Sequence, residues 1–185
     1  MKPTEELGRE HQAITVMLNV LENVCKRIES GVSVDQEDLS AMVNFLKVFA
    51  DGCHHGKEEE YLFPALERAG IPRQNGPIGV MLAEHAMGRN FVKSMSNALG
   101  GGAAGQWTES AQFVQNARGY INLLTAHIQK ENLVLFPMAD QRLTPETQEE
   151  LVKGFERVET EKVGAGVHEE FHALLGSLKQ KYSSS

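Results

Sequence analysis

The chain has 185 residues, enough for one domain with a substantial core. An apolar fraction of 41% and a charged fraction of 23% are typical of a globular protein and exclude a disordered chain. The formal net charge is −7, from 18 basic and 25 acidic residues, and the basic residues form no run. We therefore expect neither nucleic acid nor an anionic membrane as a partner.

Signals for export or membrane insertion are not found in the sequence. Residues 1–6 lack the apolar stretch of a signal peptide, and no run of 18 apolar residues could span a bilayer. The two cysteines, Cys25 and Cys53, are too few for a disulfide framework. We expect a cytoplasmic protein, with a homodimer or a protein partner left open.

Apolar residues recur at intervals of three and four almost throughout, which predicts an all-α protein. The expected helices, in chain order, span about residues 4–30, 35–63, 78–99 and 108–136, followed by a segment from residue 144 that Gly-Ala-Gly at 164–166 could divide. Four main helices predict an antiparallel four-helix bundle over residues 1–142. Residues 143–185 are expected to form a helical extension packed on the same domain.

The ends of these helices carry recognisable signals. Asp35 and Thr144 are predicted N-caps, and Thr144 is followed by a proline at the first helical position. Pro64 and Pro137 are expected to break, kink or end the second and fourth helices. The glycine-rich residues 100–105 are expected to be a flexible connector and residues 183–185 a disordered tail.

Two segments of the chain match in register. Residues 54–64 (HHGKEEEYLFP) and residues 127–137 (HIQKENLVLFP) share His, Lys, Glu, Leu, Phe and Pro at an offset of 73. Further upstream, Glu-His pairs at positions 10–11 and 84–85 repeat at an offset of 74. The chain therefore contains an internal repeat of two helical hairpins, each with a lone His followed by His-x-x-x-Glu.

This spacing places an imidazole and a carboxylate on one helix face, because Cβ atoms of residues i and i+4 lie about 5–6 Å apart. In a bundle, all four helices can direct such ligands to the centre. Four imidazoles, two bridging carboxylates and one bridging oxygen would give two metal ions five bonds each, with an open position for a diatomic ligand or peroxide. The candidate metal ligands are His11, His54, Glu58, His85, His127 and Glu131.

The tandem histidines at 54 and 55 leave a choice. The proline register selects His54, so we expect His55, about 100° further round the helix, to lie outside the ligand set or at the surface. Cys53 is expected to be a small buried residue, with reactivity near the metals as the alternative.

Several acids beside the candidate ligands have two interpretations each. Glu10 and Glu84 are expected to orient neighbouring imidazoles or to form salt bridges. Glu59 and Glu60 are expected to be solvated or to support the ligands from outside.

The C-terminal segment holds one more histidine pair. His168 and His172 are also spaced i,i+4 and are candidates for a further ligand or a gate over the bundle. The alternative is a helix packed outside the bundle with two partly exposed histidines.

The doubled His-x-x-x-Glu-x-x-x-Leu-Phe-Pro motif after isolated Glu-His pairs resembles the hemerythrin-like HHE cation-binding family over about residues 5–140. The resemblance implies a four-helix bundle around a non-haem di-iron centre, with a bridging oxo or hydroxo group and with Zn or Mn as alternative metals. The six candidate residues would be its ligands. The chain departs from oxygen-carrying hemerythrin at Arg89, where that family has a second histidine, and at Glu131, where it has Asp.

The function we expect is binding or sensing of O2, NO or peroxide at this centre. A histidine-rich ligand set leaves more positive charge on the metals than a carboxylate-rich set, which favours the ferrous state. The alternatives are simple metal storage and a di-iron oxidoreductase, either catalase- or peroxidase-like or acting in nitrosative stress or iron–sulfur repair. No acid–base pair outside the ligand set identifies an enzyme.

Overall fold

A computed structural model describes residues 1–100, 109–164 and 166–183, without the side chains at positions 162, 163 and 168. Most of the expected connector at 100–105 and two of the three residues of the expected disordered tail lie outside the described residues. Within them, the all-α prediction is confirmed, since no strand occurs. The elements are α1 (Pro3–Glu29), α2 (Gln36–Phe45), η1 (Leu46–His55), η2 (Glu58–Leu62), α3 (Phe63–Arg68), α4 (Pro77–Gly100), α5 (Ser110–Lys130), η3 (Glu131–Leu135), α6 (Phe136–Arg142), α7 (Pro145–Arg157), η4 (Val158–Val163) and α8 (Val167–Lys181).

Elements labelled η are π-helical segments within longer helices. Residues 36–68 form one uninterrupted helix, as do residues 110–142 and residues 145–163. None of the helices in the described parts of the chain combines the length and apolar character needed to cross a membrane.

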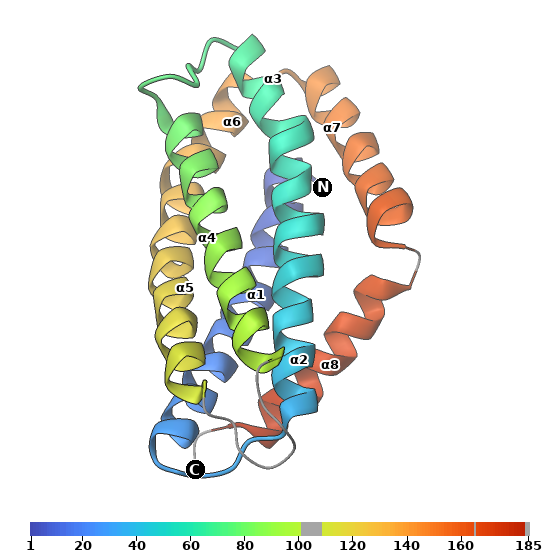
Figure 1. The fold of residues 1–185 in the computed structure, drawn as a ribbon. Helices are drawn as coiled ribbons and strands as arrows, with labels where there is room; N and C mark the ends of the chain where they lie inside the picture. The colour runs from blue at the N-terminus through green and yellow to red at the C-terminus, as the bar shows by residue number, and fades with distance from the viewer. Residues whose placement is uncertain (101–108, 165, 184–185) are drawn as a thin grey trace.

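The long helices lie side by side (Figure 1); they are the four formed by residues 3–29, 36–68, 77–100 and 110–142. The helix of residues 36–68 contacts both α1 and α4, and α5 also contacts both α1 and α4, so the four enclose a common interior. The apolar stripe of each helix faces that interior. Polar side chains that face the same interior are thereby removed from water.

Pro64 does not break its helix and Pro137 does not end its helix, contrary to these two sequence predictions, while the predicted kink at Pro64 stays a prediction. Each proline is the second residue of a short helix, α3 or α6, that directly follows a π-helical segment. The Phe63 N–H donates to the Glu58 carbonyl, five residues back instead of four. Because a proline ring clashes with the carbonyl four residues back in an α-helix, a locally wider turn lets the helix continue.

Two apolar clusters divide the interior along the bundle. The larger cluster includes Met17, Phe49 and Phe113, and the smaller includes Phe63, Ile78 and Phe155. Along the long helices, the candidate metal ligands fall between the residues of the two clusters, except that Ile128 of the larger cluster follows His127. The ligands therefore form a polar layer enclosed by apolar packing at both ends.

The C-terminal helices pack against one side of the bundle (Figure 1), where both α7 and α8 contact α1. The predicted N-cap Thr144 accepts a hydrogen bond from the Thr147 N–H at 3.3 Å. The predicted division is confirmed: Gly164 and Gly166 have φ values of 101° and 86°, a region that favours glycine, and they separate η4 from α8. Asp35 caps α2 as predicted, by accepting from the Glu37 N–H at 3.0 Å.

Candidate metal centre

The structure brings all six predicted ligands into two adjacent groups of buried side chains. In each group the ligand atoms lie within 4.8 Å of one another. Every member is no more than 2% exposed. The first group contains His11, His54, Glu58 and Glu131, and the second contains His55, Glu58, His85 and His127.

The two carboxylates span both groups. One oxygen of Glu58 lies 3.8 Å from His54 Nε2 and the other lies 3.4 Å from His85 Nε2. In the same way, the Glu131 oxygens lie 3.1 Å from His11 Nε2 and 3.2 Å from His127 Nε2. Each carboxylate is thus shared between an imidazole of the first group and an imidazole of the second.

All five histidines present the same ring nitrogen to the interior. Their Nδ1 atoms face acceptors, namely Asn132 for His11 at 2.8 Å, Glu10 for His54 at 2.8 Å, Asp51 for His55 at 3.3 Å, Glu59 for His85 at 2.8 Å and Glu84 for His127 at 2.9 Å. A carboxylate or amide oxygen only accepts, so each Nδ1 carries the proton. The Nε2 lone pairs are therefore free to bind a metal, and the outer acceptors fix the orientation of the rings.

The residues fit a metal because their inward atoms have few other partners. Buried atoms without a hydrogen-bond partner among the described residues include the Nε2 atoms of His11, His54 and His55 and both carboxylate oxygens of Glu58 and Glu131. The Nε2 atoms of His85 and His127 lie only 3.1 Å apart. Two nitrogens bound at a right angle to one ion, each at about 2.1 Å, would be about 3 Å apart. Unpaired buried polar atoms are costly, and cations placed among them would offset that cost.

Electrostatics leads to the same conclusion. Burial and the nearby Glu131 carboxylate raise the pKa of Glu58 well above its usual value. Burial also opposes the ionisation of Glu131, but the adjacent imidazoles of His11 and His127 more than offset this effect and hold its pKa low. Burial and the adjacent His11 lower the pKa of His54 to about 4. Burial likewise lowers the pKa of His55 and His85, whereas at His127 the Glu131 and Glu84 carboxylates outweigh burial and raise the pKa. Two facing carboxylates require positive charge to remain ionised together.

Two lysines of the repeat support the outer acceptors. Lys57 Nζ lies 2.5 Å from Glu10, whose other oxygen holds His54. Lys130 Nζ likewise pairs with Glu84, whose other oxygen holds His127. Glu10 and Glu84 therefore orient imidazoles and form salt bridges at once. Each of these two acids orients a histidine of the next long helix, and not the histidine that directly follows it in the sequence.

His55 is the ligand candidate that sequence reasoning missed, and the expectation of a surface position is wrong, because the residue is 2% exposed. His54 and His55 end the π-helical segment η1. A π-helical turn holds more residues than an α-helical turn, so successive side chains diverge less and both imidazoles face inward. Asp51, four residues before His55, was the available sequence signal, since it supplies the Nδ1 acceptor.

Cys53 is buried and free, as expected, and burial raises the pKa of its thiol to about 12. Its sulfur lies with carboxylate oxygens of Glu10 and Glu159 in a third compact group. The ammonium of Lys57 already pairs with both carboxylates, at 2.5 and 2.6 Å. In this third group the ammonium of Lys57 therefore takes the place that a metal ion would occupy.

The C-terminal histidines stand apart from the two ligand groups. His172 is exposed, with its ring centroid 6.4 Å from that of Phe49, and it belongs to neither group. The side chain of His168 lies outside the described residues, so its predicted role stays a prediction. Glu59 supports His85 from outside, as expected, and Glu60 is exposed.

A helical bundle with buried, carboxylate-linked histidine groups defines a class of metal-binding proteins. The family model described as "Hemerythrin HHE cation binding domain" matches residues 2–139. The chain belongs to this family, and the resemblance inferred from the motifs is confirmed.

Curated relatives extend the comparison to mycobacteria. Over 160 residues, the chain is 24% identical to Uncharacterized protein Mb2018 of Mycobacterium bovis and to Uncharacterized protein Rv1995 of Mycobacterium tuberculosis. The match covers 86% of this chain but only 62% of each relative, so the chain spans less than two thirds of their length. No solved structure matches.

Proposed function

We propose that the chain holds two iron ions in a hemerythrin-like antiparallel four-helix bundle and binds O2, NO or peroxide there. The observation that carries this proposal is the sharing of Glu58 and Glu131 between the two groups. Each carboxylate has one oxygen near an imidazole of each group. A carboxylate in that position can bridge two ions, whereas a single-ion site has no need of a second group.

The side chains divide unequally between the two proposed ions. Three imidazoles, those of His55, His85 and His127, would hold one ion, and two, those of His11 and His54, would hold the other. With both carboxylates bridging, the protein supplies nine bonds, and two six-coordinate ions would retain positions for small ligands. Bound iron would supply reversible redox change and a binding position for a diatomic ligand or peroxide.

The chain's own residues restrict what reaches the ions. Every ligand is buried, and apolar clusters close the bundle on both sides of the layer. Such enclosure favours small neutral ligands and disfavours bulk water. Five oriented imidazoles also favour the ferrous state that reacts with O2 and NO.

We further propose a cytoplasmic location. Both cysteines of the chain are free and buried, which suits a reducing compartment.

The test combines metal analysis with rapid mixing. Protein loaded anaerobically with ferrous iron is mixed with O2, NO or hydrogen peroxide in a stopped-flow spectrometer. We expect a change in the visible spectrum with at least one ligand, because bridged ferric ions have charge-transfer absorption bands and zinc ions do not. Zinc-loaded protein is the matched control. Unchanged spectra with all three ligands would contradict the proposed reactivity and favour a storage role.

A further inference from the structure

A cavity of about 340 Å³ opens beside the candidate metal centre, between the helix of residues 36–68 and α4. Its buried wall includes His55 and Tyr120, which are 2% and 1% exposed. Its outer part is lined by exposed side chains of the two helices, including Lys47 and Lys93. The cavity therefore leads from solvent to the outer side of a proposed metal ligand.

The charges around this cavity are predominantly positive. Lys47, Arg89 and Lys93 line it, opposed by the single carboxylate of Asp51. Arg89 is already paired, with its Nε 2.8 Å from Asp51 and a terminal nitrogen 2.6 Å from Glu59. Neither lysine has an ion-pair partner among the described residues. The chain has a net charge of −7, so a locally positive cavity stands out from the rest of the molecule and favours the binding of an anion.

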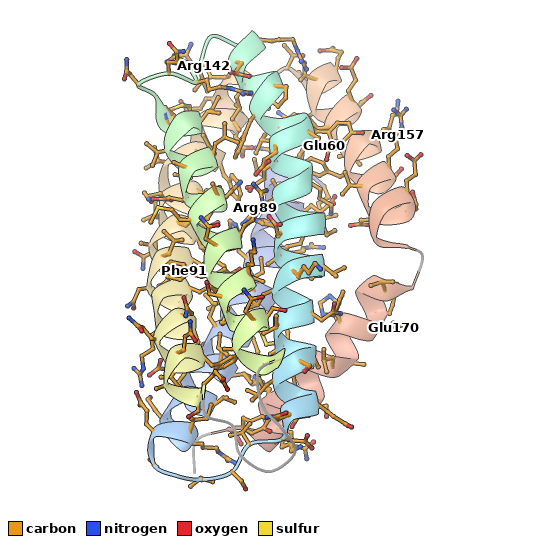
Figure 2. The ribbon with its side chains drawn as sticks, in the orientation of Figure 1. Glu60, Arg89, Phe91, Arg142, Arg157 and Glu170 are labelled. Carbon is orange, nitrogen blue, oxygen red and sulfur yellow. The ribbon has the colours of Figure 1, made fainter. Side chains whose placement is uncertain are left out.

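Arg89 connects the cavity to the metal layer. Figure 2 shows it on α4 near mid-height of the bundle. It donates hydrogen bonds to the carboxylates of Asp51 and Glu59. These two carboxylates orient the imidazoles of His55 and His85 respectively. A molecule beside Arg89 would therefore contact the outer support of two ligands without entering the metal centre.

The remaining lining is apolar, with one unused donor. Val43 and Val92 are buried on opposite sides, and Gly88 leaves the Tyr120 ring uncovered. The Tyr120 hydroxyl has no hydrogen-bond partner among the described residues, and burial raises its pKa, so it remains a donor. Apolar walls, a few convergent donors and this volume are typical of small-molecule sites.

We propose that this cavity binds a small organic carboxylate with an apolar body, as a substrate or effector of the neighbouring centre. The two lysines would attract the carboxylate, while the apolar body would lie against the valines and the Tyr120 ring. Because Asp51 and Arg89 link the cavity to His55, occupancy should perturb the metal centre. The site itself rests on the cavity and its charges, and not on the identity of the metal.

The first experiment is isothermal titration of metal-loaded protein with benzoate, benzamide and inorganic phosphate. Benzoate should bind at least tenfold more tightly than benzamide, which lacks the charge, and than phosphate, which lacks the apolar body. Equal affinity for benzoate and benzamide would overturn the charge argument. Equal affinity for benzoate and phosphate would overturn the argument for an apolar body.

Variants separate the cavity from direct binding to metal. The double variant Lys47→Glu, Lys93→Glu should weaken benzoate binding about tenfold or more. A tenfold change corresponds to about 1.4 kcal/mol, which two charge reversals supply if each costs about 0.7 kcal/mol. The control Lys153→Glu, Lys179→Glu makes the same change in net charge at exposed positions away from this cavity and should leave binding within twofold. If the first variant also stays within twofold, benzoate binds elsewhere, the metal centre included, and the proposal fails.

Gly88→Ala gives a second variant that should fold normally. The added Cβ meets Tyr120 at 3.5 Å, an ordinary contact, so it narrows the cavity without a clash. We expect weaker benzoate binding with unchanged metal content. Unchanged benzoate binding in Gly88→Ala would overturn the placement of the apolar body in this cavity, while the metal content tests the proposed function separately.

Discussion

Replacement of Lys57 by methionine should destabilise the protein far more than the same change at its repeat counterpart, Lys130. Lys57 is fully buried and pairs with Glu6 at 2.7 Å, Glu10 at 2.5 Å and Glu159 at 2.6 Å. Methionine has a similar length but no charge, so it would leave the buried Glu10 carboxylate without its cation. Removal of one partner from a buried ion pair costs about 3–5 kcal/mol.

The lower end of that range applies here, because Glu6 and Glu159 are 20% and 36% exposed and can be hydrated. We expect a loss of about 3 kcal/mol in the free energy of unfolding, or about 6–12 °C in melting temperature. The Lys130 side chain is 41% exposed and, within the described part of the chain, pairs with Glu84 alone, so its replacement should cost less than about 1 kcal/mol.

Urea denaturation followed by circular dichroism, with saturating metal in every sample, would measure both values. If the two variants lose the same free energy of unfolding to within about 0.5 kcal/mol, the reasoning is refuted. The two lysines would then contribute equally to stability despite their difference in burial.

Three further predictions concern the ligands themselves. Glu58→Gln with Glu131→Gln should remove most bound metal, measured by mass spectrometry of metal content; full occupancy would show that the carboxylates do not bridge. His55→Ala should lower metal content or affinity at least tenfold. The control His172→Ala removes an exposed histidine that lies outside both groups, and it should bind metal as the wild type does. Equal metal binding by the two variants would count against His55 as a ligand. Metal-free Glu58→Gln protein, in which the opposing effect of the raised Glu58 pKa is removed, should lose stability as the pH falls from 6.5 towards 4, because the unfolded chain protonates His54 near pH 6.5 while the folded chain, whose His54 pKa is lowered to about 4, does not. This group alone accounts for about 3 kcal/mol, and a flat unfolding free energy across that window would contradict its burial as a neutral imidazole.

The sequence predicted much of this centre because its signals are local or repeated. His54 with Glu58, and His127 with Glu131, are spaced for one helix face, and the repeat made chance coincidence implausible. The structure brings these four residues to one layer. The same local signals predicted the N-caps at Asp35 and Thr144.

What the sequence did not predict depends on helix geometry and on contacts between helices. The inward position of His55 follows from a π-helical segment, which composition does not specify. The continuation of helices through Pro64 and Pro137 has the same origin. Glu10 orients His54 and not its sequence neighbour His11, because the pairing crosses between α1 and η1.

We propose that one chain binds two iron ions between shared carboxylates. The most direct test is an anaerobic titration of metal-free protein with ferrous iron, with bound iron measured after removal of the excess. We expect saturation at two iron ions per chain for the wild type, and far less bound iron for the Glu58→Gln, Glu131→Gln double variant. Saturation of the wild type at one ion, or at none, would contradict it.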